Sequence, residues 1–166
     1  MIAYLALGSN LSDRLANLQR AVDLLAEHQG VHVLRSSRVY ETDPVGGPDQ
    51  PDYLNAVLEV ETALPPGELL DACRAVEDSM GRVREERWGP RPIDVDLLTY
   101  GDRTIAEPGL EVPHPRMHER GFVLVPLSEL CPDPPLPGGR RLSALRLGPT
   151  AVFGVRPFAP PLRVRR

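Results

Sequence analysis

The sequence predicts an α+β fold built on one antiparallel sheet. Over residues 1–100, segments with strand and helix patterns follow in the order strand, helix, strand, strand, helix, strand. The 166 residues suffice for one domain with a single core, and the composition, 42% hydrophobic and 25% charged, is ordinary for a globular protein. Because the first strand is almost wholly apolar, we expect both faces of the sheet to be covered.

The first half of the pattern gives two strands and a helix. Residues 1–7 (MIAYLAL) predict a central strand that stops at a turn, Gly8-Ser9-Asn10. A helix follows as far as Glu27, with Ser12 as its expected N-cap and Asp13 in its first turn. Its apolar residues recur at helical spacing: Leu15, Leu18, Val22 and Leu25. Residues 31–41 (VHVLRSSRVYE) alternate and are rich in β-branched residues, which predicts the second strand.

A loop and the third strand come next. Residues 42–52 (TDPVGGPDQPD) hold three prolines and two glycines without periodicity, and a loop of this length in a compact domain is usually functional or disordered. Alternation resumes over residues 53–62, which places Asn55 on the same face as Tyr53, next to the loop.

The remaining elements complete the fold class. A second helix runs from Pro65-Pro66-Gly67 to Gly81, and Cys73 lies on its apolar side as a small buried hydrophobe. The fourth strand spans residues 93–100, so the order is the split β-α-β arrangement of a ferredoxin-like βαββαβ core with both helices on one face. Residues 122–130 (FVLVPLSEL) are apolar enough to cover the other face, and such C-terminal helical and loop additions would give an α/β/α sandwich.

Charge and hydropathy restrict the partners. The formal net charge of −4 argues against a broad basic face for nucleic acid, although residues 163–166 form a small basic tail. No apolar run approaches the roughly 18 residues of a membrane span, and the N-terminus lacks a charged leader. Cys73 and Cys131 have no metal-binding spacing. We therefore expect a cytoplasmic protein with no membrane or nucleic-acid partner, a monomer or at most a weak dimer.

The stretch with the most chemistry is residues 82–98. Asp94 and Asp96 alternate on the fourth strand and so share a face, where two carboxylates repel unless a cation lies between them. An all-oxygen site suits Mg²⁺ or Mn²⁺ better than Zn²⁺. Upstream, four arginines could supply planar forks for phosphate oxygens: Arg82, Arg84, Arg87 and Arg91. The alternatives are that the aspartates lie on a solvated strand face and that the arginines lie in a solvated loop. Because the acidic pair and the arginines occur together, a metal and phosphate site is about as well supported as these alternatives.

Six blocks of sequence, in order, resemble the folate-pathway enzyme 6-hydroxymethyl-7,8-dihydropterin pyrophosphokinase. They are Leu7–Leu11 (LGSNL), Tyr40–Thr42 (YET), Asp49–Asn55 (DQPDYLN), Gly81–Arg84 (GRVR), Glu86–Asp96 (ERWGPRPIDVD) and Val112–His114 with Arg120–Phe122 (VPH and RGF). The resemblance covers about residues 1–145, so we expect a catalytic domain at 1–147 and a proline-rich, basic tail at 148–166 that is extended or mobile.

The resemblance implies a reaction and a set of site residues. ATP would give its terminal pyrophosphate to the hydroxymethyl group of the reduced pterin and release AMP, with two Mg²⁺ ions across the triphosphate. The implied catalytic and metal-binding residues are Arg82, Arg91, Asp94 and Asp96. The implied ATP-binding residues are Glu77, Arg84, Arg87, Leu97, His114 and Arg120. The implied pterin-binding residues are Thr42, Val45, Tyr53, Asn55, Trp88 and Phe122, with the two aromatic rings of Trp88 and Phe122 as the faces of a slot.

Two departures and three alternatives accompany the resemblance. The loop between Arg84 and Trp88 holds only Glu85-Glu86-Arg87, which is shorter and less basic than the family pattern, and Asp43 stands where an apolar residue or proline is expected. A ferredoxin-like nucleic-acid-binding module is disfavoured because only eight aromatic residues occur, and the four tyrosines, three phenylalanines and one tryptophan show no paired pattern. An aspartyl phosphatase would need a hydroxyl residue where Leu98 stands. A catalytically inactive homologue is the third alternative, and the intact acidic pair argues against it.

Overall fold

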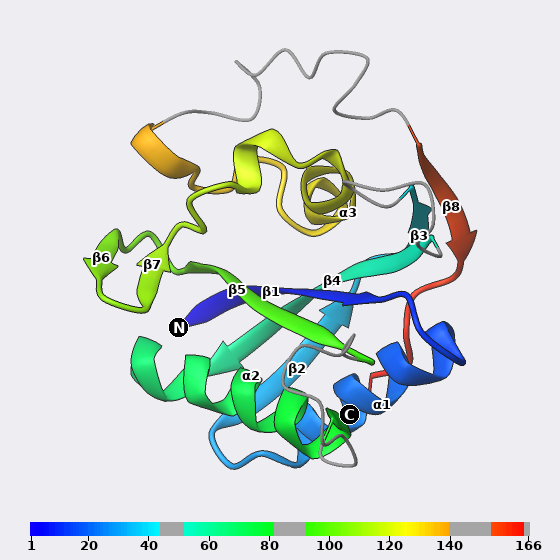
Figure 1. Ribbon diagram of the computed structural model, residues 1–166. Coiled ribbons are helices and arrows are strands. Elements are labelled where there is room, and N and C mark those ends of the chain that lie inside the picture. Colours follow the sequence, from blue (N-terminus) through cyan, green and yellow to red (C-terminus); the bar gives the residue numbers. More distant parts are fainter. Residues whose placement is uncertain (44–51, 82–91, 140–153, 165–166) are drawn as a thin grey trace.

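The computed structural model describes residues 1–43, 52–81, 92–139 and 154–164, and these residues form an antiparallel sheet with helices on both faces (Figure 1). The sheet order is β5-β1-β4-β3-β8, and β2 also pairs with β4. Its strands are β1 (Ile2–Ser9), β2 (Val31–Ser36), β3 (Val39–Thr42), β4 (Tyr53–Thr62), β5 (Asp94–Tyr100) and β8 (Val155–Ala159). The predicted strand and helix order is confirmed.

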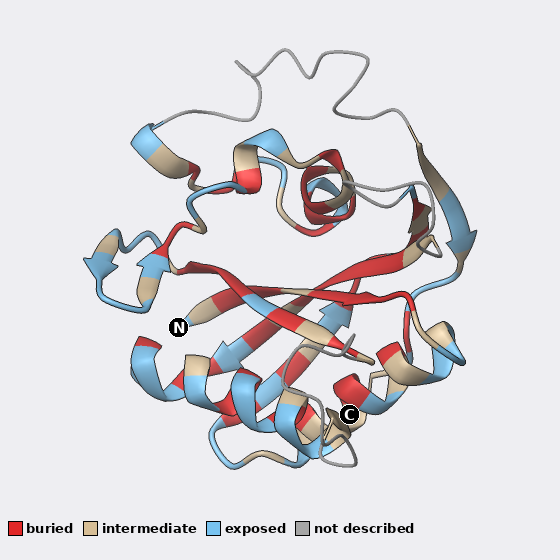
Figure 2. Ribbon diagram, in the orientation of Figure 1, coloured by how far each residue is buried: buried red, intermediate tan, exposed pale blue. Residues whose placement is uncertain are grey.

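The helices make the outer layers. On one face lie α1 (Arg14–Glu27) and α2 (Pro66–Gly81), and on the other lies α3 (Gly121–Leu130) (Figure 1). Alternation in β4 fills both cores: Leu58 packs towards α1 and α2, and Val57 packs with Leu124 and Leu127 of α3. The strands between these layers are largely buried (Figure 2). The α+β sandwich predicted from the apolar first strand is therefore confirmed.

Two local expectations were wrong. Helix α1 is capped by Asp13, whose carboxylate accepts a hydrogen bond from the Ala16 backbone N–H at 3.1 Å, while Ser12 has a positive φ of 54°. Strand β1 continues through Gly8 and Ser9, because both residues pair with β4.

The predicted strand over residues 31–41 is divided into β2 and β3. Between the two strands, the Ser37 hydroxyl accepts a hydrogen bond from the Val57 N–H at 2.9 Å, and the Ser37 N–H donates to the Val57 carbonyl at 2.8 Å. Both strands can pair with β4 because this serine bridges the break.

The C-terminal residues belong to the sheet. Residues 155–159, expected to be extended or mobile, are extended and pair with β3 as β8. Beyond β8, Leu162 is buried, and the Arg163 N–H donates to the Gln19 side chain of α1 at 2.9 Å. The predicted boundary between residues 147 and 148 lies outside the described residues.

Short elements connect β5 with α3. They are the hairpin β6 (Ile105–Glu107) and β7 (Leu110–Val112), and the 3-10 turn η1 (Met117–Glu119); a second 3-10 turn, η2 (Pro137–Gly139), follows α3. None of the described helices is both long and apolar enough to cross a membrane.

Candidate active site

A cleft of about 460 Å³ lies on the α3 side of the sheet. Its walls come from β1, β4 and β5, from the residues around η1 and the start of α3, and from β8. Seven residues that the sequence singled out line it: Thr42, Tyr53, Asn55, Asp94, Asp96, Arg120 and Phe122. Side chains expected at a pterin and side chains expected at metal-bound phosphates therefore share one cleft.

Gly8 forms the floor of this cleft. On β1 it pairs with Asn55 of β4 on one side and with Asp94 of β5 on the other. A Cβ atom at Gly8 would lie 3.0 Å from the Asn55 side-chain oxygen and 3.7 Å from Tyr53 Cδ1. The absence of a side chain thus leaves room between the amide and the carboxylate. The sequence placed Gly8 in a turn and gave it no site role, although it lies in one of the six blocks that carry the resemblance.

The acidic pair lies on the cleft face of β5. Asp94 is half-buried and Asp96 is exposed, whereas Val95 between them is buried in the core on the opposite face. Carboxylate oxygens suit a hard divalent cation. Among the described residues, no cluster of three or more His, Cys, Asp or Glu side chains could hold a metal ion. Where Mg²⁺ binds phosphates, one or two carboxylates commonly hold it together with substrate oxygens and water.

Helix α2 supports the acidic pair from below. Glu77 accepts a hydrogen bond from the Val95 backbone N–H at 3.0 Å, which fixes β5 between its two aspartates. Glu77 does not line the cleft. The side chain of Leu97 is buried in the core, so its contact with a nucleotide would be made through the backbone. That backbone lies on the sheet edge, because β5 is an edge strand and the Val95 N–H already points outward from it.

His114 lies between β7 and η1, is half-buried and does not line the cleft. Its backbone N–H donates to the Leu98 carbonyl at 2.7 Å, and its Nδ1 accepts from the Arg116 N–H at 3.3 Å. Accepting at Nδ1 leaves the proton of the neutral ring on Nε2, as a donor. Burial lowers the pKa of His114; the charge of Asp96 opposes this shift and that of Arg120 adds to it. The imidazole is therefore mainly neutral at pH 7.

The opposite wall is polar and partly aromatic. The Asn55 amide donates to the Thr42 hydroxyl at 2.6 Å, and both side chains are buried. Burial, and then the nearby charge of Asp94, raises the pKa of Tyr53, and both residues line the cleft. Phe122 is half-buried, with the Arg120 guanidinium carbon 5.7 Å from its ring centre.

Some predicted site residues lie outside the described part of the chain, and some residues that line the cleft were not predicted as site residues. Six predicted site residues lie outside the described residues: Val45, Arg82, Arg84, Arg87, Trp88 and Arg91. The lining also includes Asp43, which the sequence marked only as a departure, and Val155, which lay in the predicted tail. Cys73 is buried as predicted, and burial raises the pKa of its thiol to about 12.

Residues 4–132 match the protein family described as 7,8-dihydro-6-hydroxymethylpterin-pyrophosphokinase (HPPK). The chain belongs to this family. An HPPK relative from Bacillus subtilis (strain 168), named 2-amino-4-hydroxy-6-hydroxymethyldihydropteridine pyrophosphokinase, is 52% identical over 130 residues, 78% of this chain and 78% of its own length. A protein of the same name from Methylorubrum extorquens is 44% identical over 151 residues, 90% of this chain and 96% of its own length. The HPPK resemblance found in the six sequence blocks is therefore confirmed.

Solved structures support the HPPK fold. The Plasmodium falciparum protein HPPK-DHPS, as its A437G variant with SDX-DHP, superposes with a TM-score of 0.65 at 18% identity. The superposition covers 79% of this chain but only 42% of that one. The S436F/A437G/A613T variant with STZ-DHP gives a TM-score of 0.64 at 17% identity, covering 79% of this chain and 40% of that one. At these identities the likeness shows the fold.

Proposed function

We propose that this chain transfers the terminal pyrophosphate of ATP to the hydroxymethyl group of 6-hydroxymethyl-7,8-dihydropterin and releases AMP. The hydroxymethyl oxygen attacks the β-phosphorus, and the bond from that phosphorus to the oxygen bridging the α- and β-phosphates breaks. The observation that supports this most is the register at Gly8, which sets Asn55 and Asp94 on either side of one residue of β1. In such a transfer the protein mainly aligns the reactants and offsets charge.

The β5 side of the cleft suits the triphosphate. Asp94 and Asp96 would hold two Mg²⁺ ions, which when bound neutralise phosphate charge. Arg120 lines the same cleft. The neutral His114, whose Nδ1 accepts from the Arg116 N–H, would offer its Nε2–H to a phosphate oxygen. Four arginines outside the described residues belong to the same proposal as phosphate ligands: Arg82, Arg84, Arg87 and Arg91. The outward backbone of Leu97 and the carboxylate of Glu77 would serve the nucleoside along the edge of β5.

The β4 side suits the pterin. The Asn55 amide offers both a donor and an acceptor to the amide-like edge of the ring, and its bond to Thr42 fixes its orientation. Phe122 would stack on one face of the pterin and Trp88 on the other, an arrangement that contributes about 0.5–1.5 kcal/mol beyond burial for each offset ring pair. Tyr53 and Val45 would supply further contacts.

We infer a cytoplasmic enzyme that acts on small molecules as a monomer or a weak dimer, with no nucleic-acid or membrane partner. The net charge of −4 supports the exclusion of nucleic acid. Sedimentation at micromolar concentration checks the oligomeric state, and a stable higher oligomer would contradict it.

The test is the nucleotide product. The protein is mixed with ATP, Mg²⁺ and 6-hydroxymethyl-7,8-dihydropterin, and the products are separated by chromatography. AMP that forms only when the pterin is present is the expected result. ADP would show transfer of a single phosphoryl group and overturn the proposal, as would the absence of any pterin-dependent product. An Asp96→Ala protein, treated identically, controls for contaminating ATPases.

A further inference from the structure

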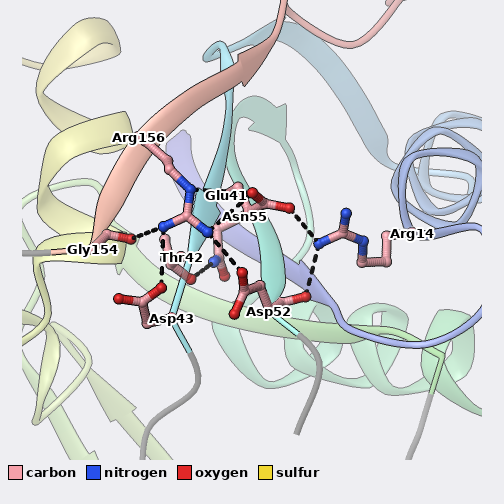
Figure 3. A network of polar contacts seen from close by, with 8 residues as sticks. All are labelled: Arg14, Glu41, Thr42, Asp43, Asp52, Asn55, Gly154 and Arg156. Atoms are coloured by element: carbon pink, nitrogen blue, oxygen red, sulfur yellow. Dashed lines mark hydrogen bonds and ion pairs between the residues drawn. The ribbon is translucent and has the colours of Figure 1, made fainter.

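Arg156 of β8 makes ion pairs with three carboxylates (Figure 3). Its Nη2 lies 3.0 Å from Glu41 Oε1 and 2.7 Å from Asp52 Oδ2, and its Nη1 lies 3.1 Å from Asp43 Oδ1. A planar guanidinium can reach three acceptors at once because its donors point in fixed, different directions. No sequence motif marked this arginine as a site residue.

The three carboxylates surround residues that line the cleft. Glu41 and Asp43 flank Thr42 at the end of β3, and Asp52 directly precedes Tyr53 at the start of β4. Arg156 therefore joins the ends of the two strands that carry the Thr42–Asn55 hydrogen bond.

A second arginine strengthens the same junction. Arg14 of α1 donates at 2.9 Å both to Glu41 and to the Asp52 backbone carbonyl (Figure 3). The hydrogen bonds from Arg14, and then those from Arg156, lower the pKa of Glu41. Glu41 is therefore ionised at neutral pH and is shared by the two guanidinium groups.

The backbone of β8 also reaches the site. Val155 pairs with Thr42 and lines the cleft, and the Asp43 N–H donates to the Gly154 carbonyl at 3.3 Å. Gly154 has a φ of +78°, and a Cβ there would lie 2.3 Å from an Asp43 carboxylate oxygen. The approach of Asp43 thus needs glycine at this position. The family match ends at residue 132, so this wall of the cleft comes from a part of the chain beyond it.

We propose that Arg156 is a positioning residue for the pterin side of the cleft: it holds the end of β3 against the start of β4 and so fixes Thr42 and Asn55. The inference rests on the proposed function, because it assigns the pterin to these two residues. A single exposed ion pair would contribute little, and the Arg156 side chain is 43% exposed. The network is different because removing Arg156 takes away the cation that Glu41, Asp43 and Asp52 share; among the described residues, only Glu41 then keeps an ion pair, with Arg14.

The experiment compares Arg156→Gln with a matched control, Arg38→Gln. Arg38 directly precedes β3, is similarly exposed at 55%, and pairs with a single carboxylate, Glu129 of α3, away from the cleft. For Arg156→Gln we expect the KM for the pterin to rise about tenfold, with kcat and the KM for ATP within about twofold of the native values. The reason is that a shift of Thr42 and Asn55 by well under 1 Å weakens the binding of the substrate that these two residues contact. Arg38→Gln should leave all three constants unchanged.

Further variants separate positioning from general stability. Arg156→Lys keeps the charge but loses the guanidinium that reaches three carboxylates, so its pterin KM should lie between those of the native and Arg156→Gln proteins. If Arg156→Gln does not fold, the pterin KM of Arg156→Lys tests the positioning role instead. If a folded Arg156 variant has a lower Tm but an unchanged pterin KM, the positioning role is wrong and the proposed function still stands. A native protein that releases no pterin-dependent AMP overturns the proposed function, and this inference falls with it.

Discussion

Replacing Gly8 with alanine tests the floor of the cleft directly. The new Cβ would lie 3.0 Å from the Asn55 side-chain oxygen, whereas ordinary contacts of this kind begin near 3.4 Å, so the amide must move by about 0.4 Å. Misplacement of a group by about 1 Å can cost a hundredfold in rate, so we expect this smaller shift to weaken pterin binding about tenfold. In free energy that is about 1.4 kcal/mol. Stability should change less, because alanine suits a strand interior better than glycine by roughly 0.5–1 kcal/mol, and this offsets the crowding.

The assay titrates pterin and ATP separately into the Gly8→Ala protein, following pterin fluorescence or the heat of binding. Gly67→Ala is the matched control, since a Cβ at Gly67 meets no atom within 4 Å. We expect pterin affinity to fall in the first variant and to stay native in the second. A folded Gly8→Ala protein that binds pterin normally would refute the assignment of the slot to the space above β1.

Three further outcomes follow from the site. Asp96→Ala should fold normally, because Asp96 is exposed, but lose at least about a hundredfold in turnover, roughly the 3 kcal/mol of one electrostatic stabiliser; near-native turnover with Mg²⁺ would exclude the metal assignment. Trp88→Ala should weaken pterin binding more than ATP binding, and equal losses in the two titrations would contradict the stacking role. Because burial lowers the pKa of His114 below its usual 6.5, the unfolded chain takes up this proton first as pH falls. The free energy of unfolding should therefore decrease as pH falls through the usual histidine pKa of 6.5. Urea titrations should show a smaller decrease for His114→Gln, and equal decreases in both proteins would contradict the burial argument.

Period-two alternation was enough to place the side chains of the central strands. It put Asn55 and Tyr53 on one face of β4, and Asp94 and Asp96 on one face of β5, and all four line the cleft. It needed no knowledge of the partner strands, because the face on which a strand residue lies depends only on its position along the strand.

The features that the sequence did not predict depend on long-range partners. The segment Gly8-Ser9-Asn10 has the composition of a turn, and Gly8 is a strand residue only because it pairs with Asn55 and Asp94. Strand β8 contains Pro157 and has no clear alternation. It pairs with β3, and its Arg156 contacts Glu41, which lies 115 residues earlier in the chain. Ser12 and Asp13 are both good caps, and a shift of one residue decides between them.

The register at Gly8 also limits where the reaction can occur. Neighbouring strands are about 4.8 Å apart, so β4 and β5 lie roughly 10 Å apart across β1. A pterin held at Asn55 and phosphates held at Asp94 would therefore meet above β1, and the hydroxymethyl group, which projects from one end of the ring, spans part of that distance. On this proposal, the backbone of β1 separates the pterin side of the cleft from the phosphate side, and its residue at that point, Gly8, has no side chain to keep the two substrates apart.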